Sequence, residues 1–405
     1  MYQIFIVLLF CLFNNLYVQA KALQELSFDQ AMEIALENNP ELRAVSLRLD
    51  INKAQIKTAR ARPDPVLFSD SGIAENTYRV GLSYNFEMGG KRKKRGAISE
   101  TNLEQAEISL EEKLLNFRAG LRNAYAARFY SKEKLKLREE LKTSYEELYE
   151  VSKRRESVGD IAMIDVLQVE TVKLANENQY TKSLSMVKKA DANLEYLLNT
   201  ELDEDIDLQA PGDYLIPKDI NQEELFRSAL EDRPELKANQ AAQKLTEQEL
   251  DLAKTKRIPN LNLSAGPDFV TGSSGQQSVF VMAQINLPIF NLRKGEIEAA
   301  EAKQEQLLSE KEAQANKIKL EVKQDYLSYL SQKEILSNYD NKLIPTVKEY
   351  AEKRLRSFEL GKSPIWIALD AQSQYIKTRL EYIDLSLEYQ SIINSLERSI
   401  GAQLP

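Results

Sequence analysis

The most constraining feature of the chain is an internal repeat. Residues 35–42, Ala-Leu-Glu-Asn-Asn-Pro-Glu-Leu, return at 229–236 as Ala-Leu-Glu-Asp-Arg-Pro-Glu-Leu, a shift of 229 − 35 = 194. Further along, Gly159 meets Gly361 at a shift of 361 − 159 = 202, which indicates a longer hairpin loop in the second copy. A unit of about 200 residues is too long for a short solenoid repeat. The pattern therefore predicts two copies of one supersecondary plan.

The first twenty residues have the pattern of a secretory signal peptide. Residues 4–13 are almost uniformly apolar, and this run is too short to cross a bilayer as a helix. Val18-Gln19-Ala20 matches a small-x-Ala cleavage site, so we expect residues 1–20 to be removed. Cys11, the sole cysteine, lies inside the apolar run after the bulky Phe10, which disfavours lipid attachment.

The composition removes much catalytic and metal-binding chemistry. The chain has no histidine, and the predicted mature part has no cysteine. The commonest general base, the commonest neutral metal ligand and the thiolate nucleophile are therefore absent. A net charge of −8 predicts no general attraction to nucleic acid. No P-loop or dinucleotide fingerprint is present, so we expect neither an enzyme nor a cofactor.

Each copy is predicted to run helix, β-hairpin, long helix, turn, helix. In the hairpins, apolar and polar residues alternate, as at Val80, Leu82, Tyr84 and Phe86. The first copy has predicted helices at 28–60, 94–157 and 163–198. The second copy has predicted helices at 222–256, 295–359 and from Gly361 to 400. Pro345 is expected to kink or break the helix at 295–359. The domain division is a signal peptide at 1–20, a first repeat at 21–198 with a hairpin at about 66–87, a linker at 199–221, and a second repeat at 222–401 with a hairpin at about 260–288.

The spacing of apolar residues predicts helices that contact one another along narrow seams. Between Leu103 and Tyr125 the apolar positions recur in steps of three, four or seven, as in a coiled coil. Four strands cannot satisfy their own sheet edges, and each has the length and alternation of a membrane-barrel strand. Four strands are too few for such a barrel, so we expect several chains to contribute.

Short motifs in this order resemble the TolC-like outer-membrane efflux proteins across essentially the whole mature chain. Residues 286–291, Asn-Leu-Pro-Ile-Phe-Asn, with Gly295 are similar to the family's strand-to-helix junction, and the turns at Gly159 and Gly361 resemble its helix-tip turns. Residues 87–92, Glu-Met-Gly-Gly-Lys-Arg, are similar to the subgroup that serves cobalt–zinc–cadmium and copper–silver exporters.

The resemblance implies a mainly α fold with a small β part. It implies a homotrimer, in which three chains of four strands form a twelve-stranded outer-membrane β-barrel continued by a long periplasmic α-helical tunnel. The implied partners are a periplasmic adaptor, which docks with the tip turns at Gly159 and Gly361, an inner-membrane pump, and outer-membrane lipid. The implied function is a passive exit duct, here for heavy-metal cations driven by a proton-coupled pump.

Basic residues gather at all four predicted helix–strand junctions. The hypothesis is that they form a ring at the periplasmic rim of the barrel, close to anionic lipid headgroups. The alternative is an ordinary solvated charge cluster, which the C-terminus of a helix also favours. These residues are Arg60, Arg62, Lys91, Arg92, Lys93, Lys94, Arg95, Lys254, Lys256, Arg257, Arg293 and Lys294.

In the resembled family, aspartates six and nine residues after the second tip glycine line the periplasmic aperture. Here those positions hold Ile367 and Asp370, and the same offsets in the first copy hold Asp165 and Gln168. The hypothesis is that Asp370 and Asp165 narrow a constriction that attracts cations. The alternative is a pair of surface carboxylates near helix starts, favoured by the helix dipole.

Two further features have open interpretations. Trp366 either contacts an adaptor or packs in a seam between helices. The acidic run 201–207 is read as a solvated loop, since carboxylates without His or Cys make only a weak site for hard cations.

Three other functions stay open. The same fold serves multidrug efflux and type I protein secretion, and a periplasmic coiled-coil structural protein without a pore would share the helical seams. The alternating hairpins argue against the last of these.

Overall fold

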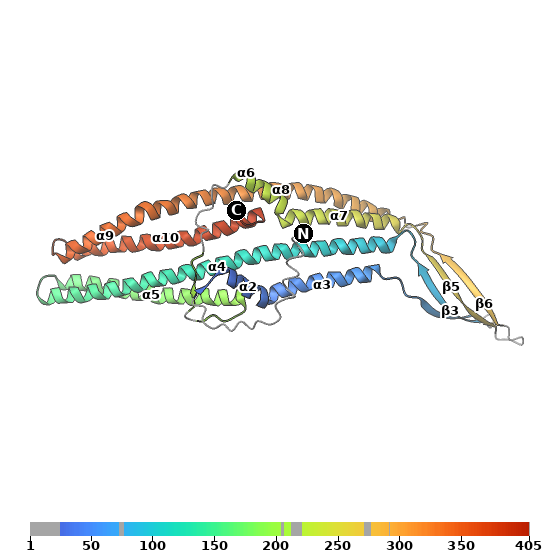
Figure 1. Ribbon diagram of the computed structural model, residues 1–405, viewed down its shortest axis with the longest axis horizontal. Helices are drawn as coiled ribbons and strands as arrows, with labels where there is room; N and C mark the ends of the chain where they lie inside the picture. Colours follow the sequence, from blue (N-terminus) through green and yellow to red (C-terminus); the bar gives the residue numbers. More distant parts are fainter. Residues whose placement is uncertain are drawn as a thin grey trace. The chain divides into compact units, whose positions relative to one another are not determined.

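The computed structural model describes residues 25–72, 77–203, 206–211, 221–270, 277–290 and 292–404, so the predicted signal peptide lies outside it. The chain is mainly helical and divides into two compact units (Figure 1). We call them the turn unit and the four-stranded unit, and each takes residues from both sequence copies. The turn unit comprises Met1–Asn39, Leu121–Ile216 and Leu336–Gln390, and the four-stranded unit comprises Pro40–Gly120, Pro217–Ile335 and Ser391–Pro405.

The four-stranded unit contains one antiparallel sheet built from both predicted hairpins. Strand β2 (Val66–Gly72) pairs with β3 (Thr77–Phe86), and β5 (Leu261–Val270) pairs with β6 (Gln277–Ile285). The two hairpins join through β3 and β5, giving the order β2-β3-β5-β6. The hairpin predictions are confirmed, and β2 and β6 form the two edges of the sheet.

Four helices of this unit follow the same order as the strands. They are α3 (Pro40–Arg60), the first part of α4 (Lys91–Ser157), α7 (Pro234–Thr255) and α8 (Lys294–Asn338). Lys113 of α4 pairs with Glu41 of α3, and Thr101 of α4 donates to Gln248 of α7 at 2.9 Å. Asn239 of α7 in turn donates to the Leu307 carbonyl of α8. Each strand therefore continues into a helix whose neighbours match the neighbours of the strand.

Two predicted helices are each broken in the structure, so their sequence predictions were wrong at one point. The first copy has α2 (Phe28–Asn38) before α3, and the second has α6 (Gln222–Asp232) before α7. Between them, Asn39 and Arg233 are extended, with ψ of 118° and 125°. Both precede a proline, whose ring disfavours the helical conformation in the residue before it.

The turn unit packs four helical segments around one apolar cluster. The segments belong to α4, α5 (Met163–Leu198), α9 (Ile344–Glu359) and α10 (Ile365–Ile400). Leu141, Val169, Phe358 and Ile365 bring one residue from each segment into the cluster. The expected break at Pro345 is confirmed, because a π-helical turn at Tyr339–Leu343 separates α8 from α9.

A small parallel pairing in the turn unit was not predicted from the sequence. Strand β1 (Glu25–Leu26) pairs with β4 (Asp207–Leu208), which lies in the segment read as a linker. The buried Tyr125 hydroxyl lies 2.6 Å from the Leu26 carbonyl and 2.8 Å from the Gln209 carbonyl. Tyr125 of α4 therefore anchors this segment.

None of the helices in the described part of the chain combines the length and apolar character needed to cross a membrane.

Candidate functional site

The two predicted tip turns have the same backbone geometry. Gly159 and Gly361 have φ of 78° and 69°, a region that L side chains rarely adopt. The Gly159 N–H donates to Glu156, and the next N–H donates to Arg155, five residues back. Gly361 repeats this pair of bonds, with the N–H groups of 361 and 362 donating to the carbonyls of 358 and 357. Both helices therefore end in a Schellman motif.

Arg155 connects these two turns inside the turn unit, which the sequence analysis missed. Its Nη1 donates to the Phe358 carbonyl at 3.1 Å, and its Nε donates to Asp160 Oδ2 at 2.6 Å. Its guanidinium also lies over the Phe358 ring, 4.6 Å from the centroid. A basic residue in the last turn before Gly159 was the available signal, but its partner is 203 residues away in sequence.

The two candidate aperture aspartates have different surroundings. Asp165 lies in the first turn of α5, where its Oδ2 accepts the Ala162 N–H at 3.2 Å. Asp370 lies on α10, is exposed, and accepts Gln374 Nε2 at 2.9 Å. Trp366, near the start of the same helix, is 55% exposed. Asp165 thus stabilises a helix start, whereas Asp370 presents its carboxylate at the surface of the chain.

Half of the predicted rim residues are engaged by other groups of the four-stranded unit. Arg95 forms a bidentate pair with Glu87 at 2.5 and 2.8 Å, and this hydrogen bond raises the pKa of Arg95. Arg257 Nε donates to the Leu292 carbonyl at 2.7 Å. The other engaged residues are Arg60 with Glu100, Lys94 with Asp251, Arg293 with Glu296, and Lys91.

Lys91 is buried, although the sequence analysis placed it on the rim. It is only 8% exposed, and its Nζ donates to the Ile258 carbonyl at 2.6 Å and to Asn260 Oδ1 at 2.5 Å. Burial lowers the pKa of its ammonium group. Gly89 and Gly90, with φ of 74° and 72°, turn the chain immediately before it. Lys91 therefore joins the start of α4 to the start of β5 and has little surface left for lipid.

The side chains of the other predicted rim residues are exposed and make no hydrogen bond or ion pair with the described residues. We call them the free cations: Arg62, Arg92, Lys93, Lys254, Lys256 and Lys294. All six lie next to the points where helices meet strands in the four-stranded unit.

The two faces of the sheet differ in chemistry. Cross-strand register places Arg79 of β3 opposite Asp70 of β2 and Asp268 of β5, so all three share a face. Arg79 Nε donates to Asp268 Oδ2 at 3.3 Å, and Ser83 Oγ lies 2.6 Å from Asn262 Oδ1 on this polar face. Most of the exposed apolar side chains of the sheet lie on the other face: Leu67, Tyr78, Leu82, Phe86, Leu263, Val279, Val281 and Ile285.

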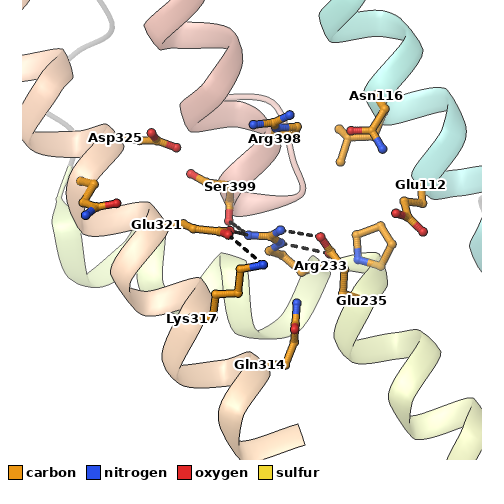
Figure 2. Close-up of a pocket in the computed structure, with 13 residues that line it drawn as sticks. Glu112, Asn116, Arg233, Glu235, Gln314, Lys317, Glu321, Asp325, Arg398 and Ser399 are labelled. Carbon is orange, nitrogen blue, oxygen red and sulfur yellow. Dashed lines mark hydrogen bonds and ion pairs between the residues drawn. The ribbon is translucent and has the colours of Figure 1, made fainter. Parts of the chain in front are cut away.

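A cavity of about 420 Å³ in the four-stranded unit is lined by an ionic network around the buried Arg233 (Figure 2). Arg233 lies between Glu235 and Glu321, forming a bidentate pair with Glu235 and donating to Glu321 Oε2 at 2.5 Å. Its Nη1 also lies 3.4 Å from the Ser399 carbonyl, near the end of α10. Burial raises the pKa of the nearby Asp325. Because its central charge is already paired, we interpret this network as structural.

The described residues include no group of three or more acidic, His or Cys side chains arranged to hold a metal ion. The part of the acidic run 201–207 that the structure describes contains no such group, and residues 204–205 lie outside it.

Comparison with known families identifies the chain. A model of the outer membrane efflux protein family matches residues 31–200 and 225–402, one stretch in each sequence copy. The chain belongs to this family. Outer membrane efflux proteins are efflux ducts of tripartite systems and not enzymes, so this protein is located in the outer membrane and serves transport.

Individual relatives of this outer membrane efflux protein differ in their named cargo. The cobalt-zinc-cadmium resistance protein CzcC of Cupriavidus metallidurans is 23% identical, over 93% of this chain and 90% of its own length. The antibiotic efflux pump outer membrane protein ArpC of Pseudomonas putida is 27% identical over 65% of this chain, which spans only 60% of that relative. Among solved structures, the outer-membrane channel OprN matches 93% of this chain and 90% of its own chain, with 19% identity and a TM-score of 0.77.

Proposed function

We propose that this outer membrane efflux protein assembles as a homotrimer whose strands close into a twelve-stranded barrel. The observation that carries the proposal is the four-stranded sheet, which has one apolar and one polar face and two edge strands, β2 and β6. A barrel in lipid needs an apolar outer face and no open edge. Joining β6 of one chain to β2 of the next would satisfy both requirements, with helices α3, α4, α7 and α8 continuing as a periplasmic tunnel.

We propose heavy-metal cations as the cargo, delivered by a proton-coupled inner-membrane pump through a periplasmic adaptor. The support is that the relative CzcC, named for cobalt, zinc and cadmium resistance, aligns over 90% of its length. The junction at residues 87–92 also has the Gly89-Gly90 pair that suggested the metal-export subgroup, and both glycines adopt positive φ. Drug efflux is the second candidate, favoured by the higher identity, over a shorter stretch, to ArpC, which is named for antibiotic efflux.

The test is a susceptibility panel on a deletion strain and on the same strain complemented with the wild-type gene. The panel pairs zinc, cobalt, cadmium, copper and silver salts with dyes, detergents and antibiotics. Sensitivity confined to metals, restored by the gene, supports the proposal and names the ion. Sensitivity confined to drugs would leave the duct but replace the cargo, and an effect on a secreted protein alone would favour type I secretion.

We also propose that the tip turns at Gly159 and Gly361 dock on the adaptor and that Asp370 lines the aperture. Asp370 is exposed, whereas the carboxylate of Asp165 already accepts a backbone N–H, so Asp370 is the better candidate. The test is cation block of single channels in planar bilayers. Asp370→Asn should weaken block by divalent cations, and Asp165→Asn is the matched comparison with a smaller effect. Identical block in Asp370→Asn and wild type would exclude the aperture role.

The free cations are the proposed contacts with anionic lipid at the periplasmic rim. A basic residue near an anionic membrane surface contributes on the order of 1 kcal/mol. Arg92→Gln with Lys93→Gln should therefore reduce assembly into anionic vesicles but leave assembly into neutral vesicles unchanged. Lys91→Met is the contrast, because its buried amine bonds within the chain and its loss should impair assembly in both lipids.

A further inference from the structure

One cross-strand row of the sheet has the sequence Phe, Gly, Gly, Phe. Phe68 of β2 is opposite Gly81 of β3, and Gly266 of β5 is opposite Phe280 of β6. The two glycines face each other, since a Cβ added to Gly266 would lie 2.5 Å from Gly81 Cα and 2.0 Å from the Val80 carbonyl oxygen. The two central strands therefore approach so closely here that no side chain fits at Gly266.

The rings at the two ends of this row meet above the glycines. Strands lie about 4.8 Å apart, so the Cα atoms of the edge strands in a flat sheet would be roughly 14 Å apart. The ring centroids of Phe68 and Phe280 are nevertheless 5.9 Å apart, at an interplanar angle of 63°. A Cβ on Gly81 would lie 2.8 Å from Phe280 Cζ and 3.0 Å from Phe68 Cζ. The missing side chains thus provide the space in which the rings touch.

The aromatic pair lies on the polar face of the sheet. Because side chains alternate between the two faces along each strand, the register puts Phe68 and Phe280 on the same face as Asp70, Arg79 and Asp268. Those three residues form the neighbouring cross-strand row. The Arg79 guanidinium lies 5.8 Å from the Phe280 ring centroid. Both rings are only partly buried. Arg79 covers part of Phe280, and the remaining surface of the two rings forms an apolar patch in the middle of a charged and hydroxylated face.

We propose that Phe68 and Phe280 form a contact site for organic cations that carry aromatic groups. The proposal rests on the proposed barrel, in which the polar face lines the lumen and three such pairs lie at one level. An aromatic cation would stack on the accessible surface of the rings, and its charge is favoured by the neighbouring row, in which the carboxylates of Asp70 and Asp268 outnumber the one guanidinium of Arg79. A hydrated metal ion gains nothing from these apolar rings. The site would give the duct a cargo class beyond metal ions.

The test is block of single-channel current by two organic cations of equal charge. The probes are tetraphenylphosphonium, which has four aromatic rings, and tetraethylammonium, which has none. The variant combines Phe68→Leu with Phe280→Leu, because leucine keeps the glycines covered but removes the π faces. We expect tetraphenylphosphonium to need a concentration about two- to fivefold higher for half block, the factor that loss of a solvent-accessible cation–π contact gives, with tetraethylammonium unchanged.

Phe269→Leu provides the matched control. Phe269 lies on β5 and pairs with Tyr78, with ring centroids 6.5 Å apart, on the apolar face that would contact lipid. The Phe269→Leu variant should leave block by tetraphenylphosphonium unchanged. A loss of block in this variant as large as in the double leucine variant would overturn the proposal. So would unchanged block in the double leucine variant, because the rings would then only cover the glycines. Failure of the wild-type protein to form channels at all would overturn the barrel itself, and this site with it.

Discussion

The two sequence copies use the same backbone break but stabilise it with different chemistry. In the first copy, buried Asn39 donates its amide to the Leu197 carbonyl at 2.9 Å. In the second, buried Arg233 takes the equivalent position, 194 residues later, and approaches the Ser399 carbonyl. Leu197 and Ser399 are themselves 202 residues apart, so both breaks contact the same point near the end of the last helix of their copy.

We call these contacts the neutral clasp and the ionic clasp. The neutral clasp also includes Asn199, which has φ of 51° and donates its side-chain amide to the Asn38 carbonyl at 3.2 Å. The ionic clasp places Gly401, with φ of 73°, at the matching position. The duplicated backbone plan thus determines where the clasp lies, whereas the side chains that form it differ between the two copies. The difference makes the ionic clasp more sensitive to substitution and to pH.

Of the changes that separate the two clasps, removal of Arg233 should cause the largest loss of stability. Arg233→Met leaves Glu235 and Glu321 without their shared partner, and breaking a buried ion pair costs several kcal/mol. Because both carboxylates are about one-third exposed, we expect the lower end, about 3 kcal/mol in the free energy of unfolding. Thermal unfolding in detergent would measure it. Adding Glu235→Gln and Glu321→Gln should restore part of the loss, and a further loss would contradict the ionic role.

Two glycines of the same conformation should respond differently to alanine. Gly159 and Gly401 have φ of 78° and 73°, which costs an alanine about 1 kcal/mol at either position. Among the described residues, none outside the immediate chain neighbours comes within 4 Å of a Cβ at Gly159, whereas a Cβ at Gly401 would lie 3.0 Å from Arg233 Cα. Gly401→Ala should therefore destabilise by about 2–3 kcal/mol in total. Equal shifts in the midpoint of unfolding for the two variants would mean that the ionic clasp accommodates the added methyl group without a loss of stability.

Loss of the neutral clasp should be milder. Asn39→Ala removes the hydrogen bond to the Leu197 carbonyl, and a bond between neutral partners contributes about 1 kcal/mol. The neighbouring Asn38→Ala is the control, because its side chain is exposed and its 3.4 Å contact to Thr200 is long. The midpoint of unfolding should fall for Asn39→Ala and hardly change for Asn38→Ala. A loss as large as that of Arg233→Met would remove the distinction between the clasps.

Acid should weaken only the ionic clasp. Its effect on stability should be smaller than that of the three kinds of substitution above. Burial alone would raise the pKa of Glu235, but the hydrogen bonds and charge of Arg233 outweigh it and lower this pKa. The stability from Glu235 is thus present above its unfolded pKa of about 4.3 and is lost as pH falls through its lower folded value. Asp325, whose pKa burial raises, acts in the opposite direction. Lys317 and Arg398 also line the cavity and face these carboxyl groups.

The measurement is the midpoint of unfolding between pH 7 and pH 3. Wild type should lose more stability over this interval than Arg233→Met, in which Glu235 has no guanidinium beside it. Parallel curves for the two proteins would show that the pair contributes nothing to the pH dependence.

The sequence predicted the order of elements better than their interruptions. Alternation identified both hairpins, because residues 79–86 follow a strict period of two and every second residue of 279–285 is apolar. The breaks at Asn39 and Arg233 were missed, although Pro40 and Pro234 were visible in the repeated motif. Long apolar periodicity was given more weight than the restriction that proline places on the residue before it. The β1–β4 pairing had no local signal, since two residues per strand are too few for any period.

Charges at the junctions were located from sequence but their roles were not. Lys91 and Arg92 are adjacent and chemically similar, yet one is buried and bonded to Ile258 while the other is a free cation. Which neighbour faces inward depends on where α4 starts, and that start depends on the two positive-φ glycines before it. The Arg155 contact with Phe358 and the Phe68–Phe280 pair join residues about 200 apart, so only the fold brings them together.

The central claim is that one chain supplies a third of a closed barrel. Native mass spectrometry of the protein extracted from outer membranes in mild detergent tests it most directly. We expect a complex of three chains, because each chain leaves the two edge strands β2 and β6 to be paired with neighbouring chains. A single chain, or any other number of chains, would contradict it.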